Sequence, residues 1–107
     1  VTLKFNADQK YTTDGISAAI FRSICQKAGV SVQTYCNRAD IPGGSTLGHI
    51  SMTHVSVHSA DVGLPQLAMH SGYETAGVRD VLDLVKVMTC YYSCSLQSHQ
   101  DGSFAIQ

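Results

Sequence analysis

Apolar residues recur along this chain at two spacings, every second position and every third or fourth position. The alternating stretches predict strands at Val1–Phe5, Val30–Cys36 and Val55–Val62. Polar and turn-forming residues separate these strands from stretches with helical spacing. Strands that alternate with helices predict a layered α/β fold.

The helical stretches carry their own start and stop signals. An apolar residue at every fourth position predicts a helix with its N-cap at Thr13 or Asp14 and its end at Gly29. A second, short helix is predicted over Ser45–Met52, because either of its first two residues can act as an N-cap.

The last apolar stretch predicts the longest helix of the chain. Ser71 and Glu74 have the spacing of a capping box, in which each side chain accepts a hydrogen bond from the other's backbone N–H. Two apolar rows follow, formed by Val78, Leu82 and Val85 and by Val81, Leu84 and Met88. The tail beyond Ser95 is polar, and we expect it to fray.

Composition and charge narrow the classes of function. At 107 residues the chain is at most one domain, and its 7 Lys and Arg against 8 Asp and Glu form no basic field for nucleic acid or an anionic membrane. No apolar run approaches the roughly 20 residues of a membrane span. We therefore expect a soluble protein with no nucleic-acid or membrane partner. The start at Val1, inside a strand, suggests a piece of a longer polypeptide.

The four cysteines form no C-x-x-C pair and are expected to be free thiols in a reducing compartment. Cys90 and Cys94 lie four residues apart on a predicted helix and could join a metal site. Zinc would need further ligands at matched spacing, and His99 alone does not supply them.

His70 is the main candidate for chemistry. The strand before it stops at Gly63 and Pro65, so the histidine enters a loop at the end of a rigid element, where ligand-binding side chains are common. His70 and Glu74 could form a metal pair on one helical turn, although the capping box is the simpler account of Glu74 and is favoured. Asp61 could also be a ligand, or an ordinary residue of the turn.

Two other groups carry weaker signals. His54 and His58 would lie roughly 13 Å apart on a strand, too far for one metal ion. The segment Gly43-Gly44-Ser45-Thr46 before a short helix is similar to an anion cradle, but it lacks the Lys of a nucleotide-binding loop. The two glycines could equally serve the turn alone. No sequence context marks a nucleophilic serine or cysteine.

Three stretches together resemble one family. Lys4-Phe5-Asn6 with Tyr11, the stretch Asp40–Gly48, and Asp61-Val62-Gly63 running through Pro65-Gln66-Leu67 to Met69-His70-Ser71 are similar, in order and spacing, to the C-terminal part of aspartyl aminopeptidase and aminopeptidase I. These related enzymes are cytosolic zinc aminopeptidases. The resemblance covers nearly the whole chain.

The resemblance implies a fold and a role for individual residues. Residues 1–107 would be the C-terminal portion of a catalytic domain with a three-layer mixed sheet and helices on both faces. His70 would be one ligand of a two-zinc site. Lys4 and Tyr11 would face the peptide substrate, with Lys4 paired to an acidic side chain. The substrate cleft would also be lined by Gly43, Gly44, Ser45, Thr46 and Met69.

The same resemblance implies what this chain lacks. The family's other zinc ligands and its general base lie upstream, so no catalytic residue is expected among these residues, and the fragment alone should be inactive. Partners would be the upstream part of the same domain and further copies in a homo-oligomer. His49, and Gly72 with Tyr73, depart from the family pattern. The alternative is a non-catalytic α/β module, or a degenerate relative that serves assembly or binds a small anion.

Overall fold

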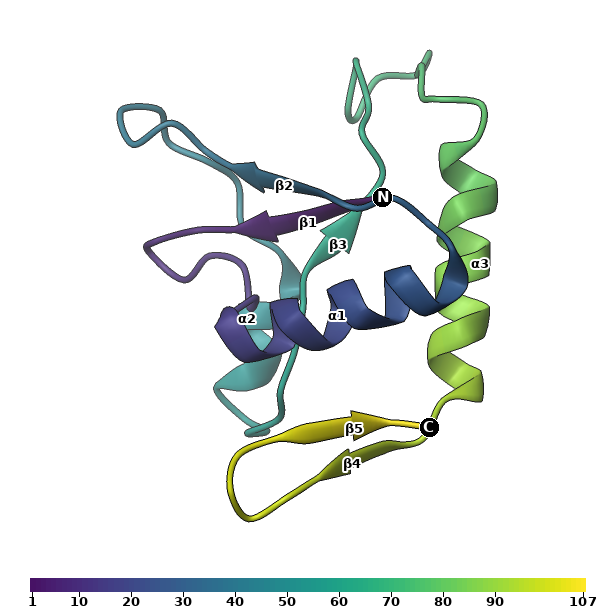
Figure 1. The fold of residues 1–107 in the computed structure, drawn as a ribbon. Coiled ribbons are helices and arrows are strands. Elements are labelled where there is room, and N and C mark those ends of the chain that lie inside the picture. Colours follow the sequence, from purple (N-terminus) through teal and green to yellow (C-terminus); the bar gives the residue numbers. More distant parts are fainter.

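The computed structural model describes all 107 residues and has the α/β architecture expected from the sequence (Figure 1). Its main sheet has the order β2-β1-β3, with β1 at Thr2–Phe5, β2 at Gln33–Cys36 and β3 at Val62–Gly63. β1 runs parallel to β2 and antiparallel to β3, so the sheet is mixed. Helix α1, Gly15–Ala28, provides the crossover that a parallel pair requires.

Helix α1 begins and ends where the sequence predicts. The Asp14 carboxylate accepts a hydrogen bond from the Ser17 backbone N–H at 2.7 Å, and the Ser17 hydroxyl oxygen accepts one from the Asp14 N–H at 2.9 Å. This reciprocal pair satisfies two donors at the helix start. At the other end Gly29 has φ 68°, a left-handed conformation that glycine adopts without a Cβ clash.

The core lies where α1 packs between the sheet and α3, which spans Asp80–Ser93. Leu3 of β1 and Val87 of α3 are fully buried, and Phe21 and Ile24 of α1 pack in the same cluster. Burial of an apolar side chain of this size contributes roughly 1.5–3 kcal/mol. The predicted row at every fourth position is therefore confirmed only in part: Ile24 lies in the core, whereas Ile16 is exposed.

The predicted third strand is wrong over most of its length. Residues 55–60 have no regular structure, and β3 contains only Val62 and Gly63. Pairing with β1 ends where the Lys4 N–H donates to the Asp61 carbonyl oxygen at 2.9 Å. The valines before Asp61 lie past the end of β1, so their β propensity has no ladder to join. The predicted second strand is likewise shortened, because β2 begins only at Gln33.

The predicted capping box before the last helix is also wrong. Helix α3 begins at Asp80, its N-cap position is Arg79, and no side chain caps it. At 14 residues it equals α1 and is not the longest helix. Glu74 instead hydrogen-bonds within the preceding loop. Instead of starting a helix, this segment closes a loop, with a backbone hydrogen bond from the Leu67 N–H to the Thr75 carbonyl oxygen and a bridge between Gln66 and Ala76.

The tail is ordered, which corrects the expectation that it frays. β4, Leu96–Ser98, pairs antiparallel with β5, Phe104–Ile106, at the foot of the molecule (Figure 1). Gly102, with φ 82°, allows the tight turn between them. The ring of Phe104 meets the edge of His58 at a centroid distance of 5.4 Å, which attaches the hairpin to the body.

The short predicted helix is confirmed as α2, Leu47–Met52, which follows Thr46. No helix in the structure combines the length and apolar character that crossing a membrane requires.

Candidate functional site

Three residues predicted to face substrate gather around Asp61 at one end of the sheet. The Lys4 Nζ atom lies 3.3 Å from the Asp61 carboxylate and 5.4 Å from the centre of the Tyr11 ring. The other carboxylate oxygen of Asp61 accepts a hydrogen bond from the Thr46 hydroxyl. The side chains of Lys4 and Asp61 are 23% and 10% exposed, so this ion pair is only partly screened by water. We call Lys4, Tyr11, Thr46 and Asp61 the lysine pocket.

Backbone contacts fix this pocket to the sheet. The Asp61 N–H donates to the Thr13 hydroxyl oxygen at 2.7 Å, directly before α1 begins. The Thr46 N–H donates to the Lys10 carbonyl oxygen, and the Lys10 ammonium donates to the Gly43 carbonyl oxygen, each at 3.4 Å. The loop before α2 is therefore held to the segment that follows β1, and this places the Thr46 hydroxyl beside Asp61.

The glycine loop is built differently from an anion cradle. Neither Gly43 nor Gly44 has a positive φ. A Cβ at Gly43 would lie 1.6 Å from the Asn37 side-chain amide, whereas a Cβ at Gly44 would meet nothing within 4 Å. Ser45 is exposed, and the Thr46 hydroxyl bonds Asp61 instead of capping α2. With an aspartate already beside it, this loop does not favour a free anion.

His70 and Met69 lie in a separate, exposed loop after β3. An isolated bridge between Gln66 and Ala76 closes the loop. Both side chains are exposed, and His70 has φ 69°, a left-handed backbone that non-glycine residues adopt uncommonly. Residues in such conformations cluster at active sites and ligand-binding loops.

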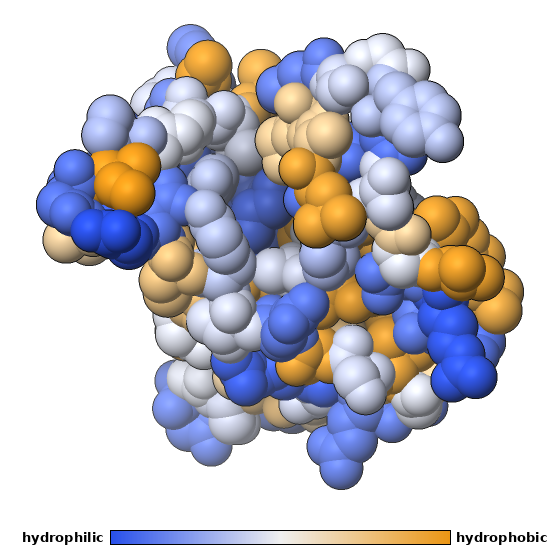
Figure 2. All heavy atoms as spheres, turned by 90° about the horizontal axis from the view of Figure 1, so that it is seen from above, coloured by the Kyte–Doolittle hydropathy of each residue, from blue (hydrophilic) through white to orange (hydrophobic).

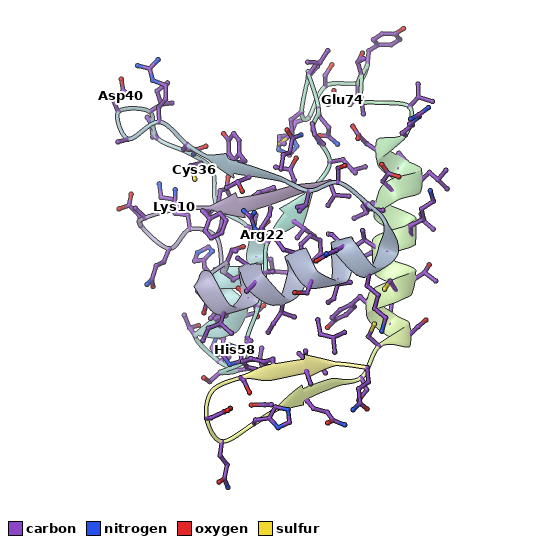
Figure 3. The ribbon with its side chains drawn as sticks, viewed as in Figure 1. Lys10, Arg22, Cys36, Asp40, His58 and Glu74 are labelled. Atoms are coloured by element: carbon purple, nitrogen blue, oxygen red, sulfur yellow. The ribbon has the colours of Figure 1, made fainter.

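Glu74 holds the His70 loop in shape. Its carboxylate accepts hydrogen bonds from the Ala68 and Thr75 backbone N–H groups, both at 2.8 Å. Neither the capping box nor a metal pair with His70 is formed. Figure 3 shows Glu74 in the loop at the top of the molecule, well away from Lys10 beside the lysine pocket. The structure thus brings Lys4, Tyr11 and Thr46 together but leaves Met69 and His70 apart from them.

The residues present do not complete a metal site. No group of three or more His, Cys, Asp or Glu side chains is placed to hold a metal ion. The sulfur atoms of Cys90 and Cys94 lie 3.8 Å apart, and all four cysteines are reduced. Desolvation, and then the contact with Cys94, raise the pKa of the Cys90 thiol, which disfavours the thiolate that metals bind. His70 is thus a single donor without partners in this chain.

Sequence reasoning considered Asp61 only as a possible metal ligand or a turn residue, and it did not single out Lys10. Asp61 looked like a turn residue beside Gly63, and nothing in its local sequence showed that Lys4 and Thr46, distant along the chain, converge on it. Lys10 gave no signal, because its role is to bind the backbone of a loop that begins more than 30 residues later.

Comparison with known proteins identifies the family. The sequence model of the aminopeptidase I zinc metalloprotease family, M18, matches residues 1–92. The match ends at Tyr92, so the β4–β5 hairpin lies outside it.

Two curated relatives carry the same family name. The chain is 46% identical over 91 residues to a probable M18 family aminopeptidase 2 of Clostridium novyi. The aligned region covers 85% of this chain and 21% of that protein. The chain is 43% identical over 93 residues to the protein of the same name from Pseudomonas paraeruginosa, covering 87% and 22%. The chain therefore spans about a fifth of the length of the relatives it matches.

Solved structures agree with the sequence comparison. The fold matches a chain in the cryo-electron microscopy structure of the Ape4 and Nbr1 complex with a TM-score of 0.82 and 32% identity, over 85% of this chain and 17% of that one. It matches the crystal structure of prApe1 with a TM-score of 0.82 and 25% identity, over 86% and 19%. With its sequence matched from residue 1 to 92 and its fold shared with these structures, the chain belongs to the aminopeptidase I zinc metalloprotease family, M18.

Proposed function

We propose that this chain is the C-terminal portion of the catalytic domain of a zinc metalloaminopeptidase, which removes N-terminal residues, preferentially acidic ones, from peptides. The family match over residues 1–92 is the observation that carries the proposal. In that domain the mixed sheet would be covered by helices on both faces. Residues 1–107 would supply one metal ligand and part of the substrate pocket.

His70 is the proposed metal ligand. Three observations support this role: the His70 imidazole is exposed, the His70 backbone is left-handed, and the Glu74 carboxylate hydrogen-bonds across the base of the loop. The chain has no second ligand beside it, so the remaining ligands of the two zinc ions would come from the longer polypeptide. Imidazole is a common zinc ligand, and a catalytic zinc site ordinarily takes three protein ligands. No reaction step can be derived from His70 alone.

The lysine pocket is the proposed contact for the substrate's N-terminal side chain. Lys4 would pair with an acidic side chain, and Tyr11 and Thr46 would lie against the same residue. Gly43, Gly44 and Ser45 would line the cleft beside Thr46. Met69 would contact the substrate near the metal. Clustering of Lys4, Tyr11 and Thr46 supports this assignment.

The proposed partners follow from the same assignment. They are the upstream part of the domain, peptide substrate and further copies of the protein in a homo-oligomer, in the cytoplasm. Only 10 of 107 residues are buried, which favours a chain that packs against more protein. The upstream coding sequence tests this most directly, because it should contain the missing metal-ligand segments. If an intact coding sequence lacked them, the metallopeptidase proposal would be refuted.

Replacement of His70 tests the ligand role in the longer protein. His70→Ala should remove bound zinc, measured by atomic emission, and lower kcat/KM for peptide hydrolysis by at least about 100-fold. His99→Ala is the matched control, because His99 lies in the hairpin outside the family match. It should keep full zinc and activity.

Unchanged zinc in His70→Ala would contradict the ligand role. A folded longer protein that binds no zinc and cleaves no peptide would support the alternative of a non-catalytic α/β module.

A further inference from the structure

Asp61 is the most firmly fixed charged residue of the lysine pocket. Its backbone N–H donates to Thr13, and its carbonyl oxygen accepts from the Lys4 N–H. Its carboxylate contacts the Lys4 ammonium with one oxygen and the Thr46 hydroxyl with the other. The side chain is 10% exposed, so it has little freedom to turn away from Lys4.

The Lys4 side chain has contacts that do not involve the Asp61 carboxylate. Its stem packs over Gly63, where an added Cβ would lie 3.0 Å from the Lys4 Cε atom. The Tyr11 ring lies 5.4 Å from its ammonium, within the range of a cation–π contact. The backbone of Lys4 pairs with Tyr35 of β2, and its N–H donates to the Asp61 carbonyl oxygen, a backbone contact that replacement of the Asp61 side chain leaves in place. The Asp61 carboxylate therefore matters more for the charge of the pocket than for the position of the Lys4 side chain.

The charge of Asp61 acts against an acidic substrate. Lys4 and Asp61 together are neutral, so an incoming carboxylate would have to share the ammonium with a resident one. The Asp61 carboxylate lies 3.3 Å from the Lys4 Nζ atom. If the substrate carboxylate approached the opposite side of Nζ at a similar distance, the two carboxylates would lie about 6 Å apart. Like charges at that distance in a partly buried site repel each other appreciably. A neutral side chain meets no such repulsion.

We propose that Asp61, as the resident counter-ion of Lys4, determines how strongly this pocket prefers acidic over neutral N-terminal residues. The inference rests on the proposed function, in which Lys4 faces the substrate's side chain. It assigns Asp61 a role in specificity that lowers the preference for acidic substrates. Specificity is a difference between affinities, and a repulsive group can set it as well as an attractive one.

The test compares peptides that begin with Asp or Glu with peptides that begin with Asn or Gln, using the longer protein. The readout is the ratio of kcat/KM for the acid over the matching amide. Asp61→Asn keeps an oxygen that can accept from Thr46 but removes the charge, so the ratio should rise about tenfold. The increase should come mainly from a lower KM for the acidic peptides. Asp40→Asn, which removes an exposed charge paired with Arg38, should leave the ratio unchanged.

Lys4→Met separates this inference from the proposed function. The variant should bring the ratio below one, because no cation then attracts the acidic side chain while the Asp61 carboxylate still repels it. If Lys4→Met changes nothing, Lys4 does not read the side chain, and both the pocket assignment and the role of Asp61 are overturned. If Lys4→Met lowers the ratio while Asp61→Asn leaves it unchanged or lowers it, only the role of Asp61 is overturned.

A second variant covers the case in which Asp61→Asn fails to fold. Thr46→Val keeps the charge of Asp61 but releases its second carboxylate oxygen, which can then also turn to Lys4. The acid-to-amide ratio should fall about twofold to threefold. A rise in the ratio would overturn the proposal.

Discussion

Glu74 shows how one side chain can shape a functional loop. Its carboxylate binds the N–H of Ala68, before His70, and the N–H of Thr75, after it. Leu67 and Thr75 add a backbone hydrogen bond of 3.1 Å across the base of the loop. The left-handed conformation of His70 costs of order 1 kcal/mol, so contacts at the base must hold it.

Replacement of Glu74 should therefore loosen the loop without touching His70. In Glu74→Ala, the Ala68 and Thr75 N–H groups lose their acceptor. A hydrogen bond to a charged group typically contributes about 1.5–3 kcal/mol, and less where water can replace the lost acceptor. Hydrogen exchange at Ala68 and Thr75 should become at least about tenfold faster. Glu74→Gln is the matched control, because its amide oxygen can accept the same bonds, and exchange should increase less. Equal hydrogen-exchange rates in the two variants would contradict the role of the Glu74 hydrogen bonds in holding the loop.

At the scale of elements, α1 is stabilised at its start by an ionised cap. The Ser17 backbone N–H, and to a smaller extent the Ser17 hydroxyl, hold the pKa of Asp14 below its ordinary value of 3.8, and desolvation opposes them. Because the folded pKa is the lower one, the unfolded chain binds more protons in acid. The cap's ionic contribution is therefore present above the unfolded pKa and is lost as pH falls through the folded pKa.

Asp14→Asn should remove this pH dependence while keeping an oxygen that can accept from Ser17. Urea unfolding of the protein between pH 5 and about pH 3 should show the wild type losing more stability than the variant. At pH 7, Asp14→Ala should cost roughly 1 kcal/mol, and Asp14→Asn less, because Asn is also a favourable N-cap. Parallel stability curves for the wild type and Asp14→Asn would show that the cap's charge plays no part.

The elements that departed from expectation did so for a common reason. Val55–Ala60 have the composition of a strand, but the four residues of β1 offer no further partner. Ser71 and Glu74 have the spacing of a cap, but contacts with residues 66–68 hold this segment in a closed loop. The tail lacks an apolar pattern, yet it forms a hairpin, and Phe104 of this hairpin packs on His58. Each outcome was decided by a partner distant in sequence.

At the scale of the whole molecule, this chain leaves much of its apolar surface exposed. The face of α3 that carries Val81, Leu82 and Val85 has each of these side chains more than half exposed. Apolar side chains are visible on the side of the molecule where α3 lies (Figures 1 and 2). The radius of gyration is 14.8 Å, against about 13 Å for a compact domain of this length. These features fit a chain that is covered by more protein.

The proposed upstream partner predicts where protection will appear. In the 107-residue chain alone, α3 should exchange its amide hydrogens quickly and the protein should bind a hydrophobic dye, because large exposed apolar patches are uncommon on monomers. When the upstream region is present, exchange in α3 should slow by at least about tenfold and dye binding should fall. Unchanged exchange in α3 would place its partner elsewhere.

The sequence by itself determined the local features of this protein. The family resemblance supplied the proposed substrate contacts, which are Lys4, Tyr11, Gly43, Gly44, Ser45, Thr46 and Met69. Helix α1 with its Asp14 and Gly29 ends, helix α2 and the strand β1 follow from short-range patterns. These features depend on neighbouring residues, whose interactions survive in any tertiary context. The α/β class also followed, because it needs only the order of the elements.

Only the tertiary structure decided the contacts between distant segments. It placed Asp61 between Lys4 and Thr46 and limited β3 to two residues. It also directed the Glu74 carboxylate to the backbone N–H of Ala68, across the loop. A single aspartate in a turn has the same local sequence whether it faces water or an ammonium group. Its role depends on which charged side chain the fold brings within a few ångströms, and that distance is a property of the folded chain.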